Sequence, residues 1–132
     1  MRNLLIFAAL AAFAAEPRST VFEWEKMAHK TTANGERRNI VDRATATMKR
    51  FESHVTTLDE GKASHAPHRH ADEEVVIVKE GTLEVTIEGK PQLASTGSMV
   101  IFSSNELHGI RNGGKGRASY YVLRIETGTA PK

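Results

Sequence analysis

The chain has 132 residues, which is the length of one domain, and its formal net charge is only +2. It contains no cysteine, which excludes disulfides, thiolate metal sites and a cysteine nucleophile. Its 18 Lys and Arg residues nearly balance its 16 Asp and Glu residues, so the charge gives no reason to expect a nucleic-acid partner.

Residues 1–14 have the pattern of a secretory signal peptide. A basic start at Arg2 precedes an apolar run from Leu4 to Phe13, and Ala12-Phe13-Ala14 fits a small-x-small cleavage site. The alternative is an uncleaved anchor helix, but the run is short for a membrane span and Glu16-Pro17-Arg18 ends it abruptly. We therefore expect cleavage after Ala14 and secretion, or export to the periplasm of a Gram-negative bacterium, with no stable membrane insertion.

The segments that follow favour short strands joined by turns. Residues 19–30 mix helical and strand periodicity and could form a short helix or an edge strand. Asn34-Gly35 predicts a hairpin between 30–32 and 37–41, and a strand over 51–58 is closed by Asp59-Glu60-Gly61. Further strands are expected over 74–78, 82–88, 92–93, 98–102, 108–111 and 119–125.

This succession of strands predicts an all-β sandwich or barrel, because turns recur about every 8–12 residues and no convincing amphipathic helix follows the leader. No repeat or linker divides the chain, so we expect one domain. Within it we assign residues 15–50 to N-terminal strands that serve dimerisation, 51–126 to the barrel core and 127–132 to a tail.

A histidine-rich stretch carries the chemistry. His68, His70 and Glu74 all occupy even positions. On a strand that is continuous through them, residues two and four apart point to the same face, so two imidazoles and a carboxylate would project together. Such donors suit one divalent transition metal, namely Fe, Mn, Ni, Cu or Zn. A fourth ligand must come from elsewhere, and His108 is the candidate.

Two motifs make the chain resemble the cupin superfamily. The first has six residues after its opening glycine where the family has five, and it consists of Gly61, His68, His70, Glu74 and Gly81. The second keeps every spacing but has a serine and an asparagine where the family has proline and glycine, and it consists of Gly97, Ser103, Asn105, His108 and Asn112. Both departures fall in a turn, so they affect its rigidity more than the ligands.

The resemblance implies a double-stranded β-helix (jelly-roll) cupin barrel with one metal bound by His68, His70, Glu74 and His108. Such a set occupies four positions of an octahedron and leaves two adjacent positions open for water, substrate or dioxygen. In several metal-dependent cupin enzymes the matching glutamate also moves a proton, so Glu74 is the candidate general base. The alternatives are a purely ligating Glu74, and a degenerate cupin whose histidines only fill a polar barrel.

Other polar residues are assigned smaller roles. We interpret His65 as a solvent-exposed or supporting residue, and His29 and His54 as ordinary surface residues. A carboxylate or phosphate substrate would need a cation inside the barrel. Arg111 and Arg124 are the strand-borne candidates, and the pattern does not decide which way they face.

Three functions are compatible with the resemblance. The first is a dioxygenase-like enzyme of the quercetinase type, in which Glu74 takes the proton of an enol. The second is a non-redox isomerase, lyase or decarboxylase acting on a sugar or carboxylic acid. The third is a cupin that binds ligand or metal without turnover. In each case we expect a small-molecule partner, no nucleic acid, and a homodimer that pairs through Val21–Val41.

Overall fold

The computed structural model describes residues 18–128, and this range folds into nine strands and one short 3-10 helix. The predicted signal peptide and residues 129–132 of the predicted tail lie outside the described residues. The helix is η1 (Trp24–Lys26), and the strands are β1 (His29–Thr32), β2 (Gly35–Arg43), β3 (Met48–Leu58), β4 (Glu73–Glu80), β5 (Thr82–Ile87), β6 (Lys90–Ser95), β7 (Met99–Phe102), β8 (His108–Asn112) and β9 (Ala118–Thr127). No helix in this range is long and apolar enough to cross a membrane.

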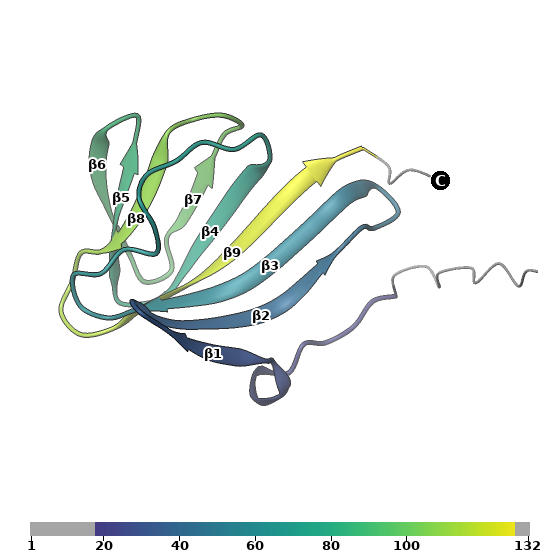
Figure 1. The fold of residues 1–132 in the computed structure, drawn as a ribbon, viewed down its shortest axis with the longest axis horizontal. Coiled ribbons are helices and arrows are strands. Elements are labelled where there is room, and N and C mark those ends of the chain that lie inside the picture. The colour runs from purple at the N-terminus through teal and green to yellow at the C-terminus, as the bar shows by residue number, and fades with distance from the viewer. Residues whose placement is uncertain (1–17, 129–132) are drawn as a thin grey trace, which may run out of the picture.

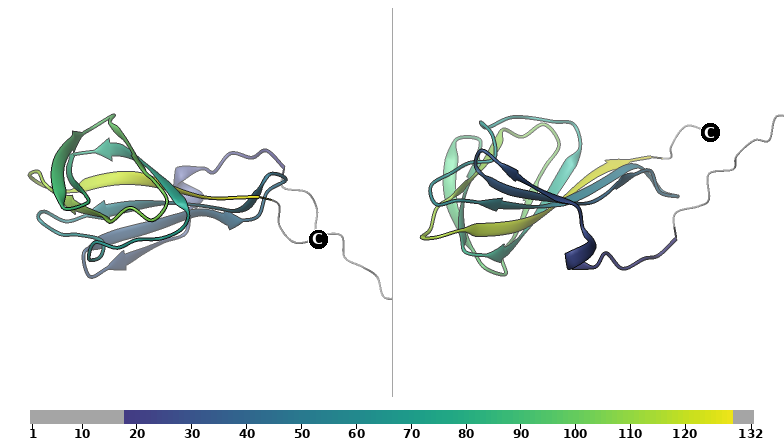
Figure 2. Two further views of the ribbon diagram at one scale, coloured as in Figure 1. Left: turned by 90° about the horizontal axis from the view of Figure 1, so that it is seen from above. Right: turned by 60° about the horizontal axis from the view of Figure 1, so that its bottom comes forward.

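The strands form two antiparallel sheets. The larger has the order β1-β2-β3-β9-β4-β7, and the smaller has the order β6-β5-β8. The small sheet faces the β4–β7 side of the large sheet, while β2, β3 and β9 extend beyond it (Figures 1 and 2). This arrangement confirms the prediction of an all-β, double-stranded β-helix barrel.

The barrel core lies between the two sheets. Strand β5 shows why, because its apolar residues Leu83 and Val85 are buried while the intervening Glu84 and Thr86 are only partly covered. They pack with inward side chains of the large sheet, of which Val76 and Phe102 are fully buried. Each such side chain stabilises the fold by roughly 1.5–3 kcal/mol through removal of apolar surface from water.

The N-terminal hairpin belongs to the same sheet as the barrel. β1 and β2 pair as the Asn34-Gly35 turn predicts, and β2 continues onto β3. Segment 19–30 contributes both expected elements in part, since η1 precedes the edge strand β1. The Trp24 ring lies against the outer face of the sheet, where the Arg38 guanidinium is 4.3 Å and the Lys79 ammonium 4.6 Å from its centroid.

One expectation about local structure is wrong. The histidine stretch is not a continuous strand, because β4 begins only at Glu73 and bends at Ala71 and Asp72 separate it from His70. The physical reason is that the chain changes sheets here. His68 bridges to β8 of the small sheet, whereas β4 belongs to the large one.

Candidate metal centre

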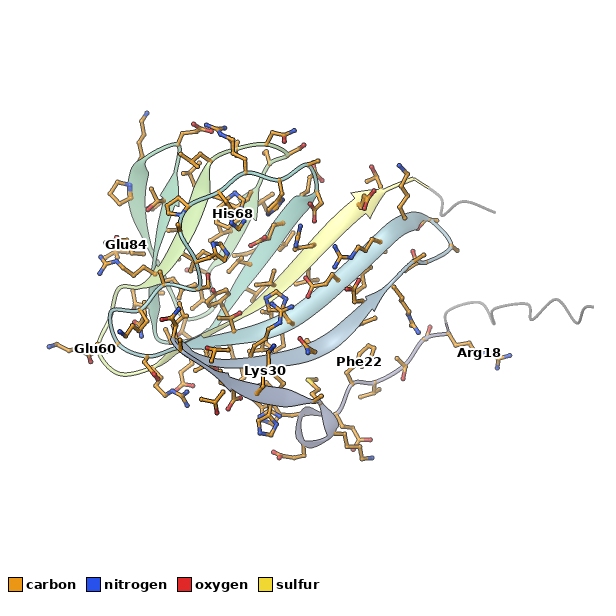
Figure 3. The ribbon with its side chains drawn as sticks, viewed as in Figure 1. Arg18, Phe22, Lys30, Glu60, His68 and Glu84 are labelled. Atoms are coloured by element: carbon orange, nitrogen blue, oxygen red, sulfur yellow. The ribbon has the colours of Figure 1, made fainter. Side chains whose placement is uncertain are left out.

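The fold brings three predicted ligands together. One ring nitrogen from each of His68, His70 and His108 lies within 4.8 Å of the others. His68 and His70 lie on the loop that crosses the barrel before β4, and His108 begins β8 (Figure 3). A cluster of three imidazoles without sulfur suits a transition metal with open coordination positions.

Backbone hydrogen bonds hold the two motifs in register. His68 and His108 exchange both of their backbone N–H···O bonds, each at 3.0 Å. The backbone N–H of Asn105 donates to the carbonyl of His70 at 2.8 Å. Asn105 takes a left-handed φ of 62° at the position where the family has glycine. Asparagine is among the residues that best tolerate this conformation, so the turn keeps its shape despite the substitution.

Glu74 joins the cluster from β4. Its side chain is buried, and Oε2 lies 3.1 Å from Nε2 of His70 and 4.0 Å from Nε2 of His108. The carboxylate is therefore next to the imidazole cluster, as the spacing predicted. Binding of a metal by these four residues remains a prediction, because the geometry describes donors only.

Backbone carbonyls orient two of the three imidazoles toward Glu74. Nδ1 of His70 lies 2.8 Å from the carbonyl of Asp72, and Nδ1 of His108 lies 2.9 Å from the carbonyl of Glu106. A carbonyl only accepts, so both Nδ1 atoms carry a proton, and the Nε2 atom of each ring faces the Glu74 carboxylate. Among the described residues, the buried Nε2 of His108 has no hydrogen-bond partner. Two Nε2 atoms that converge on a carboxylate in this way offer a donor set that suits a divalent metal.

Surrounding side chains fix the rings. Phe102 stacks on His108 with the ring centroids 4.2 Å apart, and His65 stacks on His68 at 4.0 Å. His65 is otherwise exposed and its Nδ1 lies 2.9 Å from the carbonyl oxygen of Ala66, which agrees with a supporting role. The sequence carried no signal for the Phe102 contact, because β7 had to be placed beside β4 first.

An ion pair between Arg124 and Asp72 supports His70 on its Nδ1 side. Arg124 of β9 donates two hydrogen bonds to the Asp72 carboxylate, at 2.7 and 3.0 Å. Burial raises the pKa of Asp72, but the bonds from Arg124 and the backbone outweigh it and lower the pKa overall. The role of Asp72 was not predicted, because its contact with His70 is made by a backbone carbonyl, which every residue type has. Arg124 faces the cavity, whereas Arg111 pairs with Glu84 on the exposed surface.

Burial and neighbouring imidazoles determine the charge of His68. Desolvation, then the proximity of His65, His108, His70 and Arg124, lowers the pKa of His68 to about 4 in the metal-free protein. His68 is therefore neutral at pH 7, which is the form that binds metal.

We expect the metal-free protein to lose stability as the pH falls from about 6.5 toward 4. In this window the unfolded chain protonates His68 and the folded chain does not, so the free energy of unfolding decreases with decreasing pH. Urea unfolding at pH 7 and pH 4.5 measures the loss. It should be smaller in His68→Gln, which lacks the titrating group, and equal losses in both proteins would contradict the assignment.

A cavity of about 290 Å³ adjoins the cluster on the inner face of the large sheet. Its wall is polar around the charged side chains of Arg37 and Arg124 and apolar around Leu58, Ile110 and Val122. His68 and Glu74 line the same cavity. Its volume is close to the lower end of the range for small-molecule sites.

The interpretation of His54 as a surface residue is wrong. Its side chain is only 7 % exposed and lines the cavity from β3. The strand pattern could have indicated this, because His54 has the same parity as Thr56 and Leu58, whose side chains face inward. His29, by contrast, is exposed as expected.

Fold and cluster together define a small antiparallel barrel with a histidine-rich centre beside an internal cavity. Residues 54–124 match the family model described as "Cupin domain", and the chain belongs to this family. The second motif behaves accordingly, since the buried Asn112 side chain bonds the carbonyls of Leu58 and Gly116 and stabilises the turn after β8. A search of curated protein sequences gave no significant match.

Solved structures with different functions share the fold. A predicted oxalate decarboxylase of Thermotoga maritima is 17 % identical with a TM-score of 0.68, covering 81 % of this chain and 99 % of its own. The polyketide cyclase RemF of Streptomyces resistomycificus is 14 % identical with a TM-score of 0.66, and the match covers 82 % of this chain and 80 % of RemF. A sugar phosphate isomerase of Silicibacter pomeroyi is 17 % identical with a TM-score of 0.64, and the match covers 82 % of this chain and 76 % of the isomerase. At these identities the likeness shows the fold alone.

Proposed function

We propose that the protein is an exported, metal-dependent enzyme that acts on a small oxygen-bearing molecule. The observation that carries this proposal is the convergence of three imidazole nitrogens and the Glu74 carboxylate beside the cavity that His68 and Glu74 line. Here the cluster adjoins space large enough for a ligand, which supports a reactive site.

The residues divide the chemistry between them. His68, His70 and His108 would hold the metal, with Glu74 as the fourth ligand. A bound divalent metal supplies Lewis acidity, which lowers the pKa of a substrate hydroxyl or enol. Glu74 lies beside the imidazoles and can accept the released proton through its carboxylate oxygen, while Arg124 keeps His70 in place through Asp72.

The cavity wall favours the non-redox class. Arg37, His54, Thr56 and Tyr120 offer hydrogen-bonding groups suited to a hydroxylated or carboxylated substrate, as an isomerase, lyase or decarboxylase would bind. A dioxygenase of the quercetinase type is the second candidate. The apolar part of the wall, formed by Leu58, Ile110 and Val122, supports it because a flat ring could lie there.

Turnover assays distinguish these candidates. Protein loaded separately with Fe, Mn, Ni, Cu or Zn would be screened against sugar acids, hydroxy acids, diketones and flavonols, in air and without oxygen. We expect turnover without oxygen, and Glu74→Gln should lower kcat by roughly 10²–10⁴-fold. Oxygen-dependent turnover would identify the dioxygenase instead. Tight ligand binding with no turnover would show that the protein is not an enzyme and would support the third function, a cupin that binds ligand.

Export is part of the proposal and rests on residues 1–14 of the sequence. Expression of the full chain in a Gram-negative host should yield a periplasmic protein whose first residue is Ala15. N-terminal sequencing of the periplasmic fraction tests this. An intact N-terminus in the cytoplasmic fraction would contradict it.

A homodimer is supported by apolar side chains on the outer face of the large sheet. Ile77, Met99 and Ile101 are 38 %, 63 % and 59 % exposed, and they are neighbours in the β4–β7 register. Val21 and Phe22 of the N-terminal segment are also exposed. We expect a dimer in light scattering and a shift toward monomer in Ile101→Lys, since interfaces exclude charge from their core. A monodisperse wild-type monomer would contradict the dimer.

A further inference from the structure

A second polar centre lies in the cavity, away from the histidine cluster. It is built on β3, where the buried His54 and Glu52 both have the inward parity of the strand. Nδ1 of His54 lies 2.7 Å from Oε1 of Glu52, and the same oxygen accepts a hydrogen bond from Nη2 of Arg37 at 2.8 Å. The imidazole is thus held by a carboxylate that is itself held by a guanidinium.

The arrangement decides which nitrogen of His54 is basic. Burial raises the pKa of Glu52, but the hydrogen bond and charge of His54 and the charge of Arg37 outweigh burial and lower it overall. The ionised carboxylate only accepts, so Nδ1 carries a proton, and Nε2 is the nitrogen that can exchange a proton with a ligand. Within residues 18–128, Nε2 of His54 makes no hydrogen bond, and it is not one of the polar atoms that are buried away from solvent without a partner. The ring borders the cavity, so Nε2 is accessible to a ligand there.

The His54 centre and the candidate metal centre share one cavity and one sheet face. In the register of the large sheet, His54 lies opposite Val122 of β9, and Val122 lies opposite Val76 of β4. Glu74 is two residues before Val76 on the same face. Two strand spacings of about 4.8 Å and a two-residue offset of about 3.3 Å per residue separate the two backbone positions by roughly 12 Å, which a molecule of several linked carbons can span through a contact at each end.

We propose that His54 is a second acid–base residue, positioned by Glu52, for the substrate whose other end lies at the histidine cluster. This inference rests on the proposed function and specifies its substrate as a molecule with two oxygen-bearing groups. In the step assigned to His54, an O–H or C–H bond breaks, the proton bonds to Nε2 and the electron pair stays on the substrate. The imidazolium is stabilised by Glu52, as in other carboxylate–histidine pairs, and returns the proton when the product forms.

The first test needs no substrate and uses diethyl pyrocarbonate, which acylates neutral imidazole, on zinc-loaded protein. Mass spectrometry of peptides should show His54 modified at least as fast as the exposed His29, although His54 is only 7 % exposed. Glu52→Gln should slow the reaction at His54 by about tenfold and leave the rate at His29 unchanged. An unreactive His54 in wild type would overturn the proposal, whatever the outcome of the turnover assays.

The second test uses a compound that the turnover screen identifies. His54→Gln should lower kcat by roughly 10²–10⁴-fold with unchanged metal content, whereas His29→Gln should have no effect. In Glu52→Gln the acid limb of the pH profile of kcat/KM should shift. Imidazole added to His54→Ala should restore part of the rate, which a packing role cannot explain. Unchanged kcat in His54→Gln would overturn the proposal while leaving the metal-dependent function intact.

Discussion

Protein purified without chelator is expected to contain about one divalent transition metal per chain, and His108→Ala and His68→Ala are expected to lose it. Loss of a residue that only supports a ligand lowers metal affinity about 10–100-fold, so loss of a ligand should exceed about 100-fold. The reason lies in the geometry, because the buried His108 Nε2 has no hydrogen-bond partner within residues 18–128 and two backbone hydrogen bonds join His68 to His108. Elemental analysis and competition with a chelator measure both effects.

Two variants serve as controls for the metal measurement. His29→Ala removes an exposed imidazole far from the cluster, and His65→Ala removes the ring that stacks on His68 without removing a proposed ligand. His29→Ala should leave the metal affinity unchanged, and His65→Ala should keep the metal with an affinity lowered by no more than about 10–100-fold. If the folded wild-type protein contains no metal, even after reconstitution, the metalloenzyme proposal is wrong and the protein is a ligand-binding barrel. Equal metal content in all four variants would place the metal elsewhere.

Gly81→Ala is expected to destabilise the fold by about 3 kcal/mol, compared with about 1 kcal/mol for Gly89→Ala. Both glycines have nearly the same left-handed conformation, with φ of 77° and 80°. A Cβ on Gly81 would lie 2.8 Å from the carbonyl oxygen of Arg117 and 2.9 Å from Cβ of Ala118, whereas a Cβ on Gly89 would meet nothing within 4 Å. Both substitutions therefore pay the φ cost, and Gly81→Ala alone meets backbone.

Urea unfolding of the two glycine variants separates these effects. The difference between them reports the contact of the β4–β5 turn with the start of β9, because the conformational strain is common to both. Equal free energies of unfolding would show that the turn can move away from Arg117. A larger loss in Gly81→Ala than in Gly89→Ala would explain the closing glycine of the first motif by packing and not by the metal.

The strands could be predicted because their signals are local. Alternation over Thr82–Ile87 and the Asn34-Gly35 turn depend only on side chains that follow one another along the chain. The spacing of the two motifs likewise placed four donors in one candidate site, and the fold brings three imidazoles and a carboxylate together there. The wrong detail, a continuous strand through His68 and Glu74, arose because the bend depends on which sheet each end joins.

The sequence by itself determined that this is a small all-β chain with a histidine-rich pair of motifs, because periodicity and spacing are properties of the chain alone. Only the tertiary structure decided which polar groups surround the ligand space. Strand pairing between β3, β9 and β4 places His54, Arg124 and Glu74 on one inner face, although they are far apart in sequence. No local pattern encodes such neighbours, since the register of non-adjacent strands is set by packing of the whole barrel.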